Sequence, residues 1–397
     1  MRIGIDGGCL ANRRGFGRFA REVLAALARI ETGHEFVVFV DRPSVGIAPV
    51  PAGFATIPVD VKQAPSRAAS AEGRRSVGDM LAFSRAMARS GCDLVYFPAS
   101  YSFVPVWGVK RVVVTLHDTL AIAHPELVFP GGKGRLAWKA KEHAAVAWSD
   151  RIVTISEASR RDLIDWFRLP EDRVRVVTCG PEAAFRPRPG PEGAAVLRKY
   201  GVDPGGRYWL YVGGLSPHKN IPRLIEAFAR LGPDERLALV GDFGEVFHTH
   251  VPELRALVDR LGLAERVRFT GFVPDDDLAY LLTGAHALVM PSLMEGFGLP
   301  AVEAMACGTP VVASTAGALP EVVGDAGLLV DPMDVDAIAG GMRCLLDDPA
   351  RRDLLAARSL GRAALFTWDA AARSLLAVFD DLGPAPAPAL VGGRKTA

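Results

Sequence analysis

The sequence predicts an α/β protein built from two doubly wound domains, each with a parallel sheet covered by helices. Short apolar runs alternate with longer helical patterns in two successive series along the chain. These runs lack polar alternation, which is typical of strands that are buried on both faces. The 397 residues also exceed the roughly 250–300 residues that one hydrophobic core usually serves. Together these observations favour two domains.

The first series of predicted strands lies in the amino-terminal half of the chain. It comprises residues 2–6, 35–40, 94–97, 111–116, 151–155 and 173–177. Helical patterns lie between these runs, notably over residues 18–29 and 133–148. Residues 183–190 (AAFRPRPG) are rich in proline and interrupt the alternation, so we expect the linker between the domains there.

The second series of strands begins after this linker. It comprises residues 208–212, 237–240, 267–270, 287–290, 311–313 and 327–330. We therefore expect an amino-terminal domain over residues 1–184 and a second domain over residues 185–365. A last helix within residues 366–382 could pack on either domain, a return to the first domain being one of the two alternatives, and residues 383–397 form a low-complexity tail that we expect to be disordered.

Composition and charge exclude several classes of protein. The chain has 46 Lys and Arg against 45 Asp and Glu, a net charge of +1, so we expect no nucleic-acid partner. Hydrophobic residues make up 49% and charged residues 23%, which is typical of a folded protein. Its five scattered cysteines favour a reducing compartment, and no apolar stretch is long enough for a membrane span. We expect a cytoplasmic protein, with peripheral contact at the inner face of the membrane left open.

Near the amino terminus, Gly15, Gly17 and Ala20 fit the dinucleotide fingerprint G-x-G-x-x-A. In that fingerprint the first glycine directly follows the first strand, whereas here the strand ends near Asp6. The intervening loop is too long for the tight turn, so we reject a dinucleotide site. We expect instead a glycine-rich loop that opens a helix, and it either faces a phosphate or sugar held by the second domain or is a plain turn.

The densest pattern lies at residues 291–314, PSLMEGFGLPAVEAMACGTPVVAS. After a predicted strand, Glu295 opens a glycine-containing loop, and Pro300 suits the first turn of the helix that carries Glu303. The free amides from Gly298 to Ala301 would point into the cleft, where helix termini bind phosphate oxygens or sugar hydroxyls. The two carboxylates would suit the vicinal hydroxyls of a ribose or a hexose. The alternative is that both glutamates are solvated.

A second pattern, residues 211–220 (YVGGLSPHKN), follows the first strand of the second domain. Lys219 is the only lysine between Lys199 and Lys395, and it stands at the carboxyl end of that strand, ahead of a helix. Ligands of open α/β sheets bind at the carboxyl ends of strands. We therefore interpret Lys219 as a phosphate contact, in preference to an ordinary surface charge.

No convincing metal site is present in the sequence. His248 and His250 are two residues apart and lack a third ligand. The run Asp275, Asp276 and Asp277 is expected to cap the following helix and to interact with its dipole, in preference to binding a cation.

Together these segments resemble the retaining glycosyltransferases of family 4, which have the GT-B architecture of two Rossmann-like domains that face a central cleft. Glu295 and Glu303 fall on the E-x7-E motif of that family. The similarity covers most of the chain and is densest over residues 208–332. His117 and Asp118 are similar to the His-Asp element of the family's first domain, and residues 155–160 (ISEASR) are similar to the segment that follows it.

The resemblance implies a role for each matching residue. It implies that Lys219 holds the donor diphosphate with His218 and Gly214 beside it, and that Glu303 binds the nucleotide ribose. It implies further contacts to the donor, which we group by position. Glu295, Gly296 and the amides of Phe297, Gly298 and Leu299 would hold the sugar and its phosphate, Phe272 and Val273 would meet the base, His117 would contact the donor sugar, and Gly15 and Gly17 would lie against the diphosphate or the acceptor. Glu295, His117 and Lys219 are the expected catalytic residues.

The resemblance also implies the reaction. A hexose, with mannose from GDP-mannose favoured, would pass from a nucleoside-diphosphate sugar to an acceptor hydroxyl with retention of anomeric configuration, without a metal or other cofactor. The acceptor would be a sugar or a lipid-linked glycan in cell-surface polysaccharide or glycoconjugate synthesis. The alternatives are a sugar-nucleotide epimerase of similar fold and a non-catalytic nucleotide-sugar-binding partner.

The sequence departs from the family at one position. Many members place an arginine just before the lysine, whereas this chain has His218 there. Neutral histidine offers one hydrogen-bond donor where arginine offers a fork of several. We therefore expect donor binding to weaken through His218 as the pH rises from about 6 to about 8. Arg13 and Arg14 are candidates for supplying the missing charge.

Overall fold

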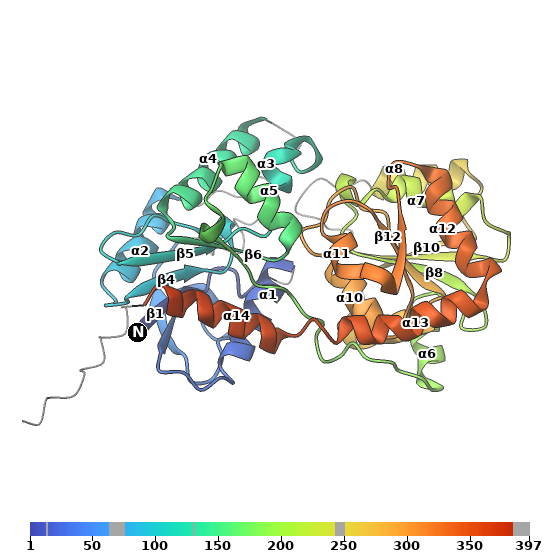
Figure 1. The fold of residues 1–397 in the computed structure, drawn as a ribbon. Helices are drawn as coiled ribbons and strands as arrows, with labels where there is room; N and C mark the ends of the chain where they lie inside the picture. The colour runs from blue at the N-terminus through green and yellow to red at the C-terminus, as the bar shows by residue number, and fades with distance from the viewer. Residues whose placement is uncertain (13–14, 63–75, 130–131, 243–250, 384–397) are drawn as a thin grey trace, which may run out of the picture.

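The computed structural model describes residues 1–12, 15–62, 76–129, 132–242 and 251–383, and it consists of two α/β units (Figure 1). Arg13, Arg14, His248, His250 and the tail from residue 384 lie outside the described residues. The larger sheet belongs to the amino-terminal half of the chain and the smaller sheet to the carboxyl-terminal half.

The first sheet contains seven parallel strands. They are β1 (Arg2–Asp6), β2 (Glu35–Asp41), β3 (Ala55–Val59), β4 (Leu94–Phe97), β5 (Arg111–Thr115), β6 (Arg151–Thr154) and β7 (Val174–Val176), in the order β3-β2-β1-β4-β5-β6-β7. The helices of this half are α1 (Gly15–Leu27), α2 (Val77–Ala88), α3 (Leu120–Ala123), α4 (Gly132–Trp148) and α5 (Glu157–Phe167).

The second sheet contains six parallel strands. They are β8 (Tyr208–Val212), β9 (Arg236–Val240), β10 (Val267–Gly271), β11 (Ala287–Met290), β12 (Val311–Ser314) and β13 (Gly327–Val330), in the order β10-β9-β8-β11-β12-β13. The helices in this half of the chain are α6 (Glu192–Lys199), α7 (Ile221–Ala229), α8 (Val251–Arg260), α9 (Asp275–Gly284), α10 (Leu299–Ala306), α11 (Leu319–Val323), α12 (Val335–Asp347), α13 (Pro349–Ala363) and α14 (Trp368–Asp381), of which α14 returns to the first unit. Two parallel α/β sheets confirm the predicted fold class.

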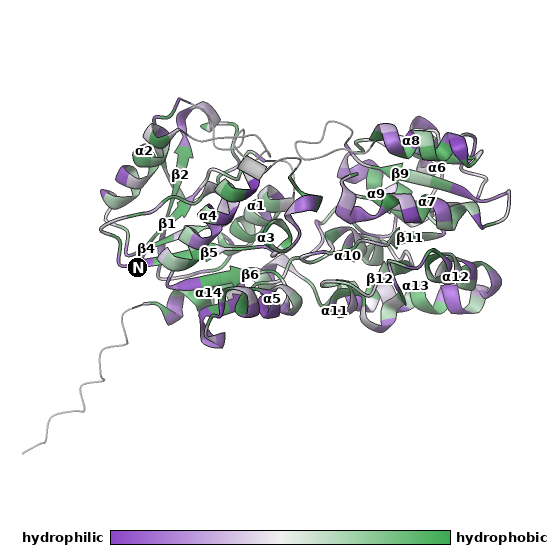
Figure 2. Cartoon of the chain, turned by 90° about the horizontal axis from the view of Figure 1, so that it is seen from above, coloured by the Kyte–Doolittle hydropathy of each residue, from purple (hydrophilic) through white to green (hydrophobic). Residues whose placement is uncertain are grey.

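The strands are buried on both faces, which explains why their sequences lack polar alternation. In β2, Val37 and Phe39 belong to one hydrophobic cluster, while Val38 and Val40 belong to the cluster on the opposite face. Figure 2 shows the same arrangement as hydrophobic strands at the centre and more hydrophilic surfaces on the surrounding helices. Helices on both faces of a sheet bury the two side-chain rows of every inner strand.

One strand, β3, was not predicted. It contains Pro58, which pairs with Val40 of β2, and it lies at the edge of the sheet. Proline lacks the N–H that a central strand must donate, so a sequence that contains it predicts a loop or an edge strand. The remaining predicted strands are confirmed, with ends that shift by a residue or two.

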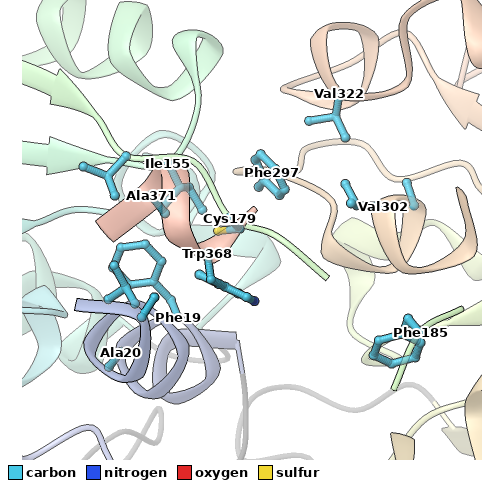
Figure 3. Packing of buried hydrophobic residues seen from close by; sticks show 14 of the residues in the cluster. Phe19, Ala20, Ile155, Cys179, Phe185, Phe297, Val302, Val322, Trp368 and Ala371 are labelled. Atoms are coloured by element: carbon cyan, nitrogen blue, oxygen red, sulfur yellow. The ribbon is translucent and has the colours of Figure 1, made fainter. Parts of the chain in front are cut away.

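The chain crosses between the two units twice, and α14 packs on the first unit (Figure 1). The ring of Trp368 on α14 lies 6.2 Å from the ring of Phe19 on α1 (Figure 3). The two crossings touch, because a Cβ on Gly180 would lie 3.0 Å from the backbone of Thr367. The two units are therefore joined by two segments of chain that pack against each other.

Candidate active site between the two units

Lys219 and Glu295 meet at the carboxyl ends of two neighbouring strands of the second sheet. Strand β8 leads through a loop into the short 3-10 helix η6 (Pro217–Lys219), and Glu295 lies in the loop after β11. The Nζ of Lys219 lies 2.8 and 2.9 Å from the two carboxylate oxygens of Glu295. Burial is the largest influence on the pKa of Glu295 and would raise it. The charge of Lys219, together with smaller contributions from His218 and from the hydrogen bonds of Lys219 and Ser292, nevertheless holds the pKa below its usual value.

Asn220 joins the two loops that carry this pair. Its backbone has a φ of 60°, a left-handed conformation that asparagine tolerates better than most residues. Its side-chain amide donates to the carbonyl oxygens of Pro291 at 2.9 Å and Pro332 at 2.6 Å. The amide of Leu293 donates to the carbonyl oxygen of His218 at 2.8 Å. Sequence analysis gave Asn220 no role, although an asparagine between a basic pair and a helix is a recognisable signal for a left-handed turn.

His218 lies beside Lys219, as expected, but its predicted pH dependence is wrong. Burial, with a further contribution from the charge of Lys219, lowers the pKa of His218 to about 3. The ring is therefore neutral throughout the range from about pH 6 to 8, so it cannot change the charge of the site there. Its Nδ1 lies 3.3 Å from the hydroxyl of Ser216.

Glu303 is buried near the middle of α10 and pairs with Arg18 of the first unit. Its side chain is 2% exposed, and Arg18 Nη1 donates to its Oε1. Burial raises the pKa of Glu303 to about 7; the charge of Arg18 opposes this shift, and the carboxylates of Asp275 and Glu182 add to it. Sequence analysis found Glu303 but missed Arg18, which is 285 residues away in the chain.

The segment from Gly296 to Leu299 brings backbone groups to the same region. Gly298 has a φ of 102° and precedes α10, and a Cβ there would lie 2.6 Å from Leu319. Phe297 lies among the buried hydrophobic residues (Figure 3). Its ring lies 5.5 Å from that of Phe366, so its side chain belongs to the core and only its backbone can face a ligand. Pro300 stands in the first turn of α10, where its missing N–H leaves no helical bond unmade.

The His-Asp element of the first unit touches this donor-side loop. A Cβ on Gly296 would lie 2.9 Å from the carbonyl oxygen of His117 and 3.1 Å from the carboxylate of Asp118. The hydroxyl of Ser159 also donates across the interface to the carbonyl oxygen of Gly296 at 3.2 Å. The structure thus brings His117 and the Glu295 loop together from opposite units, and glycine at position 296 permits the approach.

His117 is buried between two aromatic rings of α1. The ring centroids of Phe16 and Phe19 lie 4.7 and 5.1 Å from that of His117, both nearly edge-on. Burial lowers the pKa of His117 to about 3, so the imidazole is neutral. Its Nε2 has no hydrogen-bond partner among the described residues, and a buried polar atom of this kind is costly unless a ligand or a water molecule satisfies it.

The two glycines of the amino-terminal pattern play different parts. A Cβ on Gly17 would collide with the carbonyl oxygen of Asn12, so this glycine lets α1 pack closely on the preceding loop. Among the described residues, a Cβ on Gly15 would meet nothing within 4 Å. Gly15 alone therefore leaves open space at the start of α1 for a ligand to approach.

The remaining predicted contacts lie at the ends of β8 and β10. The carbonyl oxygen of Gly214 accepts a 2.6 Å hydrogen bond from the hydroxyl of Tyr211. Phe272 is 65% exposed directly after β10, whereas Val273 is buried. An exposed aromatic ring at the carboxyl end of a strand suits stacking on a base.

The three aspartates at the start of α9 do not cap that helix. Its N-cap is Pro274, which makes no side-chain capping bond. Each carboxylate instead pairs with a different cation: Asp275 with Arg18, Asp276 with Arg188 and Asp277 with Lys199. The capping half of the prediction is wrong because Pro274 occupies the N-cap position, whereas the three carboxylates do lie in the first turn of α9, where negative charge interacts favourably with the helix dipole.

Glu321 of α11 forms a further contact between the units. Its two carboxylate oxygens accept hydrogen bonds from the backbone N–H groups of Glu157 and Ala158, each at 2.8 Å. These amides open α5, where the helix dipole is positive and a carboxylate is favourable. Sequence analysis gave Glu321 no role.

The described residues also show where cavities lie and whether metal sites or membrane spans are present. Cavities of about 300 and 510 Å³ lie away from the residues above, one lined by Arg207 and Arg236 and the other by His34 and Phe54. Among the described residues, no group of three or more His, Cys, Asp or Glu side chains is arranged to hold a metal ion. Within the same residues, no helix is both long and apolar enough to cross a membrane.

Comparison with known proteins identifies related families for both halves. The family model described as Glycosyltransferase Family 4 matches residues 13–185, and the model described as Glycosyl transferases group 1 matches residues 195–360. The O-antigen chain mannosyltransferase B of Escherichia coli is 38% identical over 262 residues, which cover 66% of this chain and 68% of that protein. A D-inositol 3-phosphate glycosyltransferase of Acidothermus cellulolyticus is 35% identical over 289 residues, which cover 69% of this chain and 62% of that protein.

Solved structures share the two-unit fold. Sucrose-phosphate synthase of Thermosynechococcus elongatus superposes with a TM-score of 0.76 at 25% identity, over 96% of this chain and 99% of that chain. The Anabaena protein HepE, solved in complex with UDP and glucose, superposes with a TM-score of 0.73 at 21% identity, over 96% of this chain and all of that chain. The architecture of two parallel α/β units around an interface is therefore that of the GT-B glycosyltransferases.

Proposed function

The chain belongs to glycosyltransferase family 4, and from this premise we propose that it moves a hexose from a nucleoside-diphosphate sugar to an acceptor hydroxyl with retention of anomeric configuration. The observation that carries the proposal is the meeting of Lys219, Glu295 and the start of α10 opposite His117. A cation and the backbone amides of Gly298 and Leu299 at the start of α10 favour a diphosphate, and the carboxylates of Glu295 and Glu303 suit sugar hydroxyls.

Each residue of the site contacts a different part of the donor in this proposal. Lys219 and the amides at the start of α10 stabilise the negative charge that grows on the departing diphosphate. Glu303 accepts from the ribose hydroxyls, Glu295 orients the sugar, and Phe272 lies where the base would stack. His117 meets the sugar from the first unit, where its unpartnered Nε2 can form a hydrogen bond with a hydroxyl group.

Retention follows from a reaction on one face of the sugar. The bond between the anomeric carbon and the phosphate oxygen breaks, and its electron pair stays on the diphosphate. The acceptor oxygen forms its new bond on the same face, and its proton passes to the departing phosphate oxygen. No side chain has to act as a nucleophile, and Lys219 carries the charge that a metal ion carries in other transferases, so we propose a reaction without a metal cofactor.

Mannose is the hexose we favour, with GDP-mannose as donor. The support is the similarity to the Escherichia coli relative, an O-antigen chain mannosyltransferase. By the same likeness the acceptor is a sugar or a lipid-linked glycan in the synthesis of a surface polysaccharide or glycoconjugate. We propose that the protein works in the cytoplasm, at the inner face of the membrane when the acceptor is lipid-linked.

A thermal-shift panel of GDP, UDP and ADP sugars tests the donor site, because a ligand that binds only the native state raises its stability. We expect a rise in Tm with GDP-mannose and release of sugar to water in the absence of acceptor. NMR identifies the anomer of the sugar that is released first, and retention predicts the same anomeric configuration as in the donor. An isomerised nucleotide sugar formed from the donor alone would indicate an epimerase, and binding without any turnover would indicate a non-catalytic partner.

A further inference from the structure

Arg18 has an unusual environment for a residue near a nucleotide site. Its guanidinium lies 2.7 Å from Asp275 and 2.9 Å from Glu182, and it also donates to Glu303. The side chain is 19% exposed, and its guanidinium lies 6.0 Å from the ring centre of Phe185. Contacts with three carboxylates from three different segments fix the position of the guanidinium.

The contact with Glu303 involves one oxygen of the carboxylate. Arg18 donates to Oε1, and within the described part of the chain no protein group donates to Oε2. A carboxylate that binds the hydroxyls of a ribose uses its lone pairs in defined directions, so its orientation matters. Arg18 leaves Oε2 as the acceptor for the donor.

Arg18 and Glu303 also belong to different units. Arg18 lies in the first turns of α1, next to Gly15 and Gly17, whereas Glu303 and Asp275 belong to α10 and α9 of the second unit. The contact therefore exists only while the two units are close together. A ribose that needs an oriented Glu303 would be bound best in the closed arrangement.

We propose that Arg18 is a positioning residue for donor binding, which fixes one carboxylate oxygen of Glu303 so that the other meets the donor ribose, and which does so only when the units are closed. This inference rests on the proposed function, since it requires a nucleotide in the site. The sequence makes another arginine a candidate to replace the one missing before Lys219 and to bind the diphosphate. Arg18 has a different role in this proposal, because it contacts Glu303, the carboxylate that binds the ribose, and not the diphosphate.

The charges around Glu303 give this role a distinctive signature. The carboxylate is surrounded by Arg18 of α1, Asp275 of α9, Glu182 of the segment that crosses between the units, and Cys307, the residue that directly follows α10. Burial raises the pKa of Glu303 to about 7 even with Arg18 in place, so nucleotide affinity should rise with pH around neutrality. Without Arg18 the carboxylate would hold its proton to higher pH.

The experiment measures the affinity of UDP and GDP calorimetrically between about pH 5.5 and 8.5 for the full chain and three variants. For Arg18→Gln we expect affinity at neutral pH to fall about tenfold or more, the usual effect of losing a hydrogen bond to a charged group, with the midpoint of the pH profile moved upward. Arg18→Lys should restore the midpoint but only part of the affinity, because lysine keeps the charge and loses the fork. The loss should shrink for 2′-deoxynucleotides, which lack one of the ribose hydroxyls.

Arg188→Gln is the matched control, because Arg188 pairs with the next aspartate of α9, Asp276, and has no recorded contact with Glu303. It should leave the affinity and the midpoint unchanged. An Arg18→Gln variant with wild-type affinity, or with weaker affinity and an unmoved midpoint, would overturn the positioning role. If the wild-type chain bound neither nucleotide at any pH, the proposed function would fail first, and the wild-type titration alone would reveal it.

Discussion

Lys219 and Glu295 form an ion pair with two hydrogen bonds, although 76 residues separate them in the chain. The pair is nearly enclosed, with the side chains 19% and 10% exposed. In the ligand-free protein each charge is therefore neutralised by the other. Binding of a diphosphate to Lys219 places a second anion beside Glu295, so the carboxylate must be held by the sugar hydroxyls that arrive with that diphosphate.

Replacement of Glu295 by Gln tests this coupling. The variant keeps the shape of the side chain but removes the charge, so we expect turnover to fall by about 100-fold or more, the usual effect of removing one preorganised electrostatic contact. Ser292→Ala is the control, since it removes only the 2.7 Å hydrogen bond from Ser292 to Glu295 and should cost less than about tenfold. Measured turnover at the wild-type rate in Glu295→Gln would remove Glu295 from the catalytic residues.

Gly15 and Gly17 provide a matched pair for separating packing from binding. Gly17→Ala should destabilise the protein by about 2 kcal/mol or more, because its Cβ would collide with the backbone of the preceding loop. Gly15→Ala should change the free energy of unfolding by less than about 1 kcal/mol, because, among the described residues, nothing lies within 4 Å of the added methyl group. Chemical denaturation measures the free energy of unfolding of both variants. Equal values for Gly15→Ala and Gly17→Ala would contradict the different packing assigned to the two glycines.

Glu321 should hold the two units together through the start of α5. Glu321→Ala leaves the amides of Glu157 and Ala158 without their carboxylate, so we expect a larger radius of gyration in solution scattering and a higher KM for the donor. Glu157→Ala removes a side chain at the same helix end without removing either bond and serves as the control. An unchanged scattering profile in Glu321→Ala would show that the contact does not determine closure.

Glu142 predicts a pH dependence of stability. Burial raises the pKa of this α4 carboxyl from 4.5 to about 8, and its Oε1 accepts from the indole of Trp138 at 2.8 Å. A carboxyl whose pKa is raised on folding stabilises the native state fully below its unfolded pKa, and this contribution is lost as the pH rises through the folded value. Glu142→Gln should match the wild type near pH 4.5 and be more stable by at least about 2 kcal/mol near pH 8. A constant difference in Tm across this range would be inconsistent with a protonated Glu142.

The fold could be predicted from the sequence because buried parallel strands carry a local signal. The runs that became β8 and β11 are short, apolar and flanked by helical patterns, and the loops that follow them hold Lys219 and Glu295. The missed strand β3 contains Pro58, which carries the opposite local signal and is tolerated only because the strand lies at an edge.

The interface could not be predicted in the same way. Arg18, Glu182 and Glu321 look like ordinary surface charges in the sequence, and only the folded chain brings them onto Glu303, Asp275 and the start of α5. The pKa of His218 was misjudged for a related reason, since burial depends on packing that no local pattern reveals. Residues within one strand-loop-helix unit were therefore predictable, whereas pairs between the units were not.

The most direct test of the central claim is the affinity of Lys219→Met for nucleoside diphosphates, compared with that for the corresponding nucleosides. We expect a loss of about tenfold or more for the diphosphates and none for the nucleosides, because the ammonium group contacts phosphate. The double variant with Glu295→Gln avoids leaving a buried charge unpaired, and Lys199→Met, which removes an exposed lysine paired with Asp277, is the control. Equal affinity of Lys219→Met and the wild type for every nucleoside diphosphate would contradict the assignment of this site.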